Sequence, residues 1–165
     1  AVTATKPLDV LPLPEGQTLP RVLAAGRATG PLAGGNLSLI AALTGTDYEL
    51  DALGRVLLLE DMGEQPYRVD RMLCQLALAG KLSQAAGVVV GEMVDCEFTP
   101  EAAPEPSLPL LLADTLADHL AGLGRPVISG LPCGHGRDKW TIPFGVLATV
   151  DGYKGRLVVE EAACR

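Results

Sequence analysis

Arg55-Val-Leu-Leu-Leu-Glu60 is an apolar run enclosed by two charged residues. It lacks the alternation of apolar and polar residues that a strand with one face in water shows, so it predicts a strand buried on both faces of a parallel sheet. Gly87-Val-Val-Val-Gly91 and Pro126-Val-Ile-Ser-Gly-Leu131 are two further runs of this type. Buried strands that alternate with helical segments predict right-handed crossovers, and therefore an α/β fold with a parallel sheet.

Three helical patterns accompany these runs. The most regular follows Gly63 and Pro66 and ends at Gly80; its arginines are expected on the solvated side and Tyr67 in the core. Its apolar residues repeat at i, i+3, i+4 and i+7: Val69, Met72, Leu73 and Leu76. Residues 37–43 predict a shorter helix, with Asn36 as N-cap and Gly45 as its stop. A third helix is expected from a Ser107 cap to Leu120.

The remaining segments are less regular. Residues 1–20 carry four prolines, which block a helix and disfavour a central strand, so we expect an extended lead-in to a domain at 21–165. The glycine-rich residues 27–36 are expected to form a turn. Residues 141–159, with turn residues at 151–155, predict antiparallel strands.

Composition excludes several classes of protein. At 165 residues, with 48% apolar and 20% charged residues, the chain is expected to be one globular domain. The net charge of −7 with scattered lysines and arginines argues against nucleic acid as a partner. The apolar runs are too short to cross a membrane, and no export signal is visible. Four cysteines without CxxC spacing fit a reduced intracellular protein.

Chemistry is expected where the three buried strands end, because ligands of open α/β sheets bind outside the carboxyl ends of the strands. Glu60 and Asp61 follow the first strand, Glu92 follows the second, and His135 follows the third. Glu60 and His135 are therefore predicted to lie within hydrogen-bond reach, although 75 residues separate them. A carboxylate that orients a histidine is two thirds of an acid, base and nucleophile triad.

The nucleophile and the alternatives stay open at this point. No serine lies in a nucleophile elbow; the candidates are Ser38, Ser83, Ser107 and Ser129. Cys133 is two residues from His135 and is expected to point the other way on an extended loop. His135 could instead be structural and Glu60 a capping or rim charge, whereas His119 is expected at the surface and Trp140 in the core. A metal site would need these residues: Glu60, Asp61, Cys133 and His135; no metal-binding spacing supports it.

Long motifs narrow these alternatives. They are Gly30-Pro-Leu-Ala-Gly-Gly-Asn-Leu37, Leu57-Leu-Leu-Glu-Asp-Met-Gly-Glu-Gln-Pro-Tyr-Arg-Val-Asp-Arg-Met-Leu73, Gly130-Leu-Pro-Cys-Gly-His-Gly136 and Thr141-Ile-Pro-Phe-Gly145. In order and spacing, over roughly residues 21–160, they resemble the C-terminal half of the LD-carboxypeptidases. These serine peptidases trim murein tetrapeptides, and their family includes the microcin C immunity hydrolases.

The resemblance implies Glu60 and His135 as catalytic residues and a swivelling β/β/α fold. It also implies cytoplasmic murein recycling, homodimers, and no cofactor or metal. The family's nucleophilic serine belongs to an N-terminal flavodoxin-like domain that this chain lacks, so we expect the chain alone to be inactive and to associate through its docking surface. The expected activity of the full-length enzyme is removal of the terminal D-Ala from murein LD-tetrapeptides. The alternatives are a peptidyl-adenylate hydrolase of the immunity type and a silent binding or dimerisation module. Asn36 is either the helix cap or a substrate-binding residue.

Overall fold

The computed structural model describes residues 4–98 and 111–164. Over these residues it has helices α1 (Leu37–Leu43), α2 (Pro66–Leu78), α3 (Lys81–Gln84) and α4 (Leu112–Leu120). The strands are β1 (Pro7–Val10), β2 (Arg21–Ala24), β3 (Arg27–Asn36), β4 (Val56–Met62), β5 (Gly87–Val94), β6 (Val127–Ser129), β7 (Leu147–Asp151) and β8 (Arg156–Ala162). They form one sheet in the order β1-β8-β7-β3-β4-β5-β6-β2. The chain is thus mixed α/β, as predicted.

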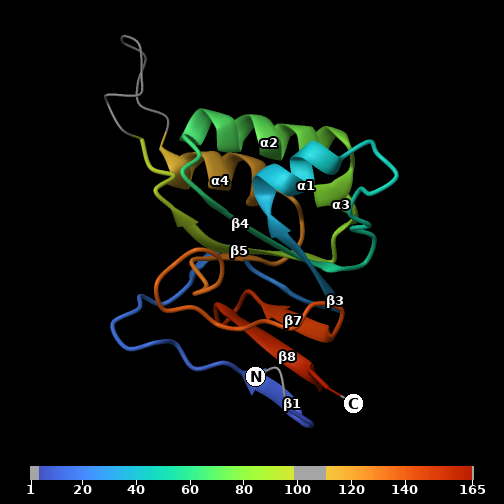
Figure 1. Ribbon diagram of the computed structural model, residues 1–165, viewed down its shortest axis with the longest axis vertical. Coiled ribbons are helices and arrows are strands. Elements are labelled where there is room, and N and C mark those ends of the chain that lie inside the picture. Colours follow the sequence, from blue (N-terminus) through green and yellow to red (C-terminus); the bar gives the residue numbers. More distant parts are fainter. Residues whose placement is uncertain (1–3, 99–110, 165) are drawn as a thin grey trace.

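The sheet bends so that the molecule has three layers. Strands β3, β4, β5 and β6 pair in parallel, whereas β7, β8 and β1 form an antiparallel part. Figure 1 shows the helices on one side of β4 and β5, and β7, β8 and β1 on the other side. The parallel strands are therefore the middle layer.

Two hydrophobic cores lie on the two faces of this middle layer. Along β4, Leu57 and Leu59 pack with the helices, whereas Val56 and Leu58 pack with residues of β7 and β8. All four side chains are at most 3% exposed. The unbroken apolar run thus serves both cores, which confirms that it forms a strand buried on both faces.

Residues 27–36 are strand β3, so the predicted turn is wrong. The strand pairs with β7 through Pro31 and with β4 from Leu32 onward, so its proline lies where it changes partner. Gly34 permits the pairing with β4. At this position, where φ is +132°, a Cβ would lie 1.9 Å from the carbonyl oxygen of Leu58. Gly34 is therefore glycine because two backbones approach closely, and no turn is needed to explain it.

The proline-rich N-terminal residues are extended, and part of them joins the sheet. Strand β1 pairs antiparallel with β8, and β2, which the sequence did not indicate, pairs antiparallel with β6. Both are edge strands, which is the position in a sheet that tolerates proline. The described ends of the chain meet there, because the amide of Cys164 donates to the carbonyl of Ala4.

The predicted helices are present with some changes. Asn36 caps α1 by accepting from the amide of Leu39, and α2 has the expected buried face. Helix α4 begins at Leu112; the expected Ser107 cap lies outside the described residues. Tyr67 was expected in the core but is 54% exposed, because it lies on the outer side of α2.

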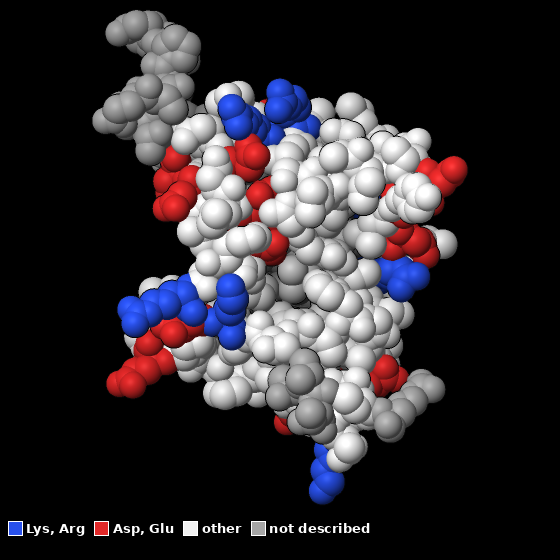
Figure 2. All heavy atoms as spheres, in the orientation of Figure 1, with Lys and Arg blue, Asp and Glu red and all other residues white. Residues whose placement is uncertain are grey.

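Two other expectations about burial change. His119 was expected at the surface, but its side chain is only 18% exposed, because α4 packs against α2. Its Nε2 lies 2.7 Å from Oδ1 of Asp70, a residue of α2. Trp140 is half-buried against the core beside β7 and β8. Over residues 4–98 and 111–164, no helix is both long and apolar enough to span a membrane. Charges of both signs are interspersed on the face in Figure 2, without a basic stripe.

Candidate active site

Glu60 and His135 meet at the carboxyl ends of the parallel strands. Glu60 lies near the end of β4, and His135 lies on the loop that follows β6. The Nδ1 atom of His135 is 2.7 Å from Oε2 of Glu60, which confirms the predicted contact. The Glu60 side chain is 9% exposed, and that of His135 is 44% exposed. The acid is thus buried beneath the strand ends while the imidazole reaches the surface.

Glycines make room for this pair. At Gly134, where φ is +121°, a Cβ would lie 2.6 Å from Oε2 of Glu60. At Gly91, on β5, a Cβ would lie 2.4 Å from the carbonyl oxygen of Cys133 and 3.2 Å from Cβ of Glu60. Any side chain at either position would push the loop away from the carboxylate. Gly91 and Gly134 are therefore explained by the close approach of the His135 loop to β5 and to Glu60.

The hydrogen bond determines which nitrogen of His135 can act as a base. A carboxylate only accepts hydrogen bonds, so Nδ1 carries the hydrogen and Nε2 has the lone pair of the neutral ring. Within the described residues Nε2 has no hydrogen-bonding partner. Such a ring can take a proton at Nε2 while the carboxylate stabilises the resulting imidazolium. The arrangement is that of a general base oriented by an acid.

Asp61 points away from this pair, toward the start of α1. Its Oδ1 accepts from Nδ2 of Asn36 at 2.8 Å, and its Oδ2 accepts from the amide of Ser38 at 2.9 Å. The side-chain oxygen of Asn36, Oδ1, accepts from the Ser38 hydroxyl and from the backbone amide of Leu39. Asn36 is therefore the helix cap, and one N–H of its amide group is left for another acceptor. Sequence reasoning placed Asp61 at this edge but missed its role in orienting Asn36, because a contact across 25 residues leaves no local pattern.

None of the described candidates, which are Ser38, Ser83, Ser129 and Cys133, has a hydrogen bond to His135. Ser38 donates to Asn36 and Ser83 donates to the carbonyl of Gly80, whereas Ser107 lies outside the described residues. Burial, followed by the nearby charges of Glu60 and Glu92, raises the pKa of the Cys133 thiol to about 12. A thiol with so high a pKa is a poor nucleophile near neutral pH.

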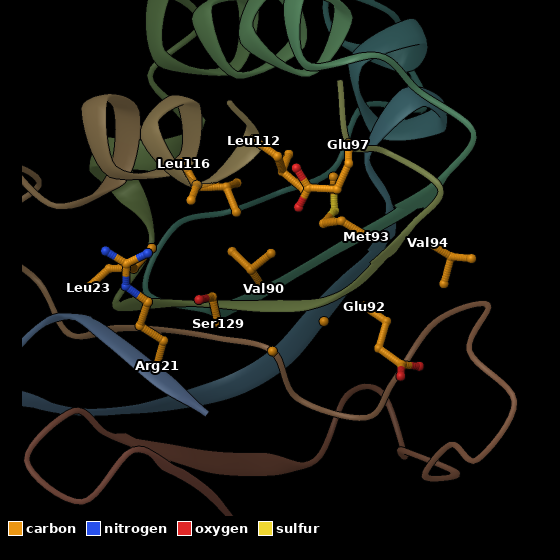
Figure 3. A pocket seen from close by; sticks show the side chains of 13 residues that line it. Arg21, Leu23, Val90, Glu92, Met93, Val94, Glu97, Leu112, Leu116 and Ser129 are labelled. Atoms are coloured by element: carbon orange, nitrogen blue, oxygen red, sulfur yellow. The ribbon is translucent and has the colours of Figure 1, made fainter. Parts of the chain in front are cut away.

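A pocket of about 390 Å³ adjoins the site, where β5 and β6 end. Its lining residues include Arg21, Glu92, Glu97 and Ser129, and α4 forms one wall (Figure 3). Neither Glu60 nor His135 lines it. In the described part of the chain, no cluster of three or more His, Cys, Asp or Glu side chains could hold a metal ion.

Known proteins match the chain in sequence and in fold. Residues 29–150 match the model of the LD-carboxypeptidase C-terminal domain. The probable murein peptide carboxypeptidase of Bacillus subtilis is 38% identical over 138 residues, which are 84% of this chain and 42% of that protein. The microcin C7 self-immunity protein MccF of Escherichia coli is 25% identical over 77% of this chain and 35% of its own length.

A solved structure also matches the fold of this chain. The crystal structure of muramoyltetrapeptide carboxypeptidase from Oxalobacter formigenes superposes with a TM-score of 0.70 at 31% identity, over 87% of this chain and 50% of that one. This chain thus spans half or less of the length of these relatives. The family model covers most of the chain, including both Glu60 and His135. The chain belongs to the LD-carboxypeptidase family, as its C-terminal domain.

Proposed function

We propose that this chain supplies the acid and base of a serine LD-carboxypeptidase that removes the terminal D-Ala from murein LD-tetrapeptides. The observation that carries the proposal is the 2.7 Å contact between His135 Nδ1 and Glu60 Oε2, with Nε2 of the ring left without a partner among the described residues. His135 is the general base and Glu60 holds its orientation. No cofactor takes part.

The nucleophile is a serine of the N-terminal domain, in the part of the protein that lies outside this chain. As its Oγ attacks the scissile carbonyl carbon, the hydroxyl proton moves to Nε2 of His135. The imidazolium then gives that proton to the amine of the leaving D-Ala as the C–N bond breaks. Water hydrolyses the acyl ester in the same way, with His135 again as base, which regenerates the serine.

Asn36 is proposed as a substrate-side residue. Its side-chain oxygen is committed to the helix cap, whereas one N–H of its amide group is left for an acceptor such as a carboxylate of the peptide.

Leu39 and Tyr48, which line a pocket with Asn36, are 66% and 83% exposed. Apolar side chains exposed together support the docking of another domain or a second copy. We therefore propose that the protein forms a homodimer, and sedimentation as a monomer at high protein concentration would contradict this. We also propose that it acts in the cytoplasm.

The test uses the full-length protein and an LD-tetrapeptide, with release of D-Ala measured by mass spectrometry. His135→Ala and Glu60→Gln are compared with His119→Gln. The last is a matched control, because His119 also bonds to a carboxylate at 2.7 Å but lies between α2 and α4. We expect His135→Ala to lower kcat by about 10⁴-fold or more, since triad members act as a unit. His119→Gln should retain the wild-type kcat.

Two outcomes would redirect the proposal. An undiminished kcat in His135→Ala would remove His135 from the mechanism. Release of D-Ala by the purified 165-residue chain alone would place the nucleophile in this half. The weaker match to the microcin C7 self-immunity protein supports a second candidate, hydrolysis of a peptidyl adenylate by the same residues. Assaying both substrates with one preparation separates the two activities.

A further inference from the structure

Residues 11–20 connect two opposite edges of the sheet. The segment leaves β1, beside β8, and enters β2, beside β6, so it joins the first and last strands of the sheet order. It is the blue coil of Figure 1, on the side of the molecule where the loop after β6 also lies. Three of its ten residues are proline, which restricts the backbone and lowers the entropy lost when the segment is held in place.

One contact joins this segment to the far end of the His135 loop. The indole N–H of Trp140 donates to the carbonyl oxygen of Pro12 at 2.8 Å. The backbone amide of Trp140 donates to the carbonyl of Pro132 at 2.7 Å, which closes the loop that carries His135. The half-buried ring of Trp140 also packs against the core beside β7 and β8. Pro12 therefore holds the residue at which the loop closes.

A second contact acts through Glu92, close to His135 itself. Nε2 of Gln17 donates to Oε1 of Glu92 at 3.3 Å. The amide of Glu92 donates to the carbonyl of Cys133 at 2.8 Å, and a Cβ on Gly136 would lie 1.7 Å from its Oε2. Figure 3 shows the Glu92 side chain directed away from the pocket and toward this loop. Glu92 thus touches the loop on both sides of His135.

The Glu92 carboxylate depends on Gln17. Its Oε2 is buried and has no hydrogen-bonding partner within residues 4–98 and 111–164. A buried carboxylate oxygen without a partner is unfavourable, and the hydrogen bond from Gln17 is the only one that the described residues donate to this carboxylate. This hydrogen bond therefore helps to hold the Glu92 side chain against Gly136. If the donor is lost, the carboxylate can turn toward water, and the loop loses the side chain on which it packs.

We propose that residues 11–20 form a strap that positions His135 against Glu60, with Gln17 and Trp140 as positioning residues. The proposal deepens the proposed function, on which it rests for the role of His135 as the base. It accounts for how a 44% exposed imidazole on a loop without regular secondary structure is held with its Nδ1 on a buried carboxylate. Neither Gln17 nor Trp140 bonds directly to Glu60 or His135.

The experiment measures solvent exchange of the imidazole N–H of His135 in ¹⁵N-labelled chain by NMR. Gln17→Met and Trp140→Phe each remove a donor and keep the apolar bulk. Gln17→Lys restores a donor toward Glu92. His119 is an internal control, because it is the other of the two histidines and its bonded nitrogen is Nε2.

A hydrogen bond between neutral groups shifts an opening equilibrium by roughly 2- to 12-fold, and one to a charged group by more. We expect the exchange of the His135 Nδ1 hydrogen to be faster by roughly 2- to 12-fold in Trp140→Phe, and by at least as much in Gln17→Met because Gln17 bonds to a carboxylate. The double variant should exchange at least about 5-fold faster if the two contacts add. Gln17→Lys should exchange at the wild-type rate, and His119 should be unchanged in all variants.

Unchanged exchange at His135 in both single variants would overturn the strap, whatever their thermal stability. In that case the two contacts stabilise the fold without positioning the base. Because this measurement needs neither substrate nor the serine, it is independent of the reaction. Full-length Gln17→Met should lower kcat at unchanged KM. Faster exchange together with a wild-type enzyme that releases no D-Ala would uphold the strap and reject the proposed activity.

Discussion

Gly134→Ala should separate the acid from the base by steric contact alone. A Cβ at this position would lie 2.6 Å from Oε2 of Glu60, and ordinary contact begins at about 3.4 Å, so one of the two groups has to move by about 0.8 Å. A displacement of that size along the bond lengthens the 2.7 Å contact between His135 and Glu60 to about 3.5 Å, beyond an effective hydrogen bond. Misplacement of a catalytic group by about 1 Å can cost roughly 10²-fold in rate.

The substitution also strains the backbone, and a second glycine separates this effect from the contact. Gly35 has φ of +140° against +121° at Gly134, and a Cβ at Gly35 would meet nothing within 4 Å. Each Gly→Ala change should cost about 1–3 kcal/mol from the backbone conformation. Only Gly134→Ala adds about 1–3 kcal/mol for the overlap with Glu60.

The assay combines urea unfolding with the NMR signal of the His135 ring. Gly35→Ala should lose stability and keep the wild-type Nδ1–H signal. Gly134→Ala should lose more stability, and that signal should broaden through fast exchange. If Gly134→Ala keeps the wild-type signal and loses no more stability than Gly35→Ala, the account of how this loop and the buried acid fit together is wrong.

Four other predictions concern single residues. Because its raised pKa is about 12, Cys133 should have a thiolate fraction at pH 8 about 10³-fold below that of a free cysteine. Iodoacetamide should therefore label the exposed Cys74 before Cys133, as measured by peptide mapping. The same shift means that the folded state retains the Cys133 proton, and the stability due to this group, measured by urea unfolding, should fall as pH rises above about 8.5. Asn36→Ser should keep the cap but lose the donor to the buried Asp61 carboxylate, so stability should fall by about 1.5–3 kcal/mol, and KM of the full-length enzyme should rise if the remaining amide N–H binds substrate; an unchanged KM would leave Asn36 a purely structural role. Gly34→Ala should cost more than about 4 kcal/mol in urea unfolding, because its Cβ would overlap the carbonyl of Leu58.

The predictable parts of the fold are those in which burial leaves a pattern of apolar residues along the sequence. The run before Glu60 is apolar throughout because both of its faces are covered, and α2 shows helical spacing because only one of its faces is buried. The meeting of Glu60 and His135 followed from a general rule about strand ends and needed no contact information.

The parts that were not predictable depend on distant partners. Strand β3 has glycines instead of a side-chain pattern, and its antiparallel partner β7 lies more than a hundred residues later. His119 is polar and lies on a surface helix, so only its contact with Asp70, 49 residues away, shows that it is largely buried. Gln17 likewise shows no local sign of its contact with Glu92.

Both edge strands of the sheet come from residues 7–24. Strand β1 covers the free side of β8, and β2 covers the free side of β6. A chain shortened to begin at Arg21 would keep β2 but leave the backbone N–H and C=O groups of β8 open to another molecule. Unpaired edges of apolar strands are templates for aggregation, whereas Pro7 at the native edge interrupts the row of donors. The proline-rich lead-in therefore also protects the protein from joining sheet to sheet with its own copies.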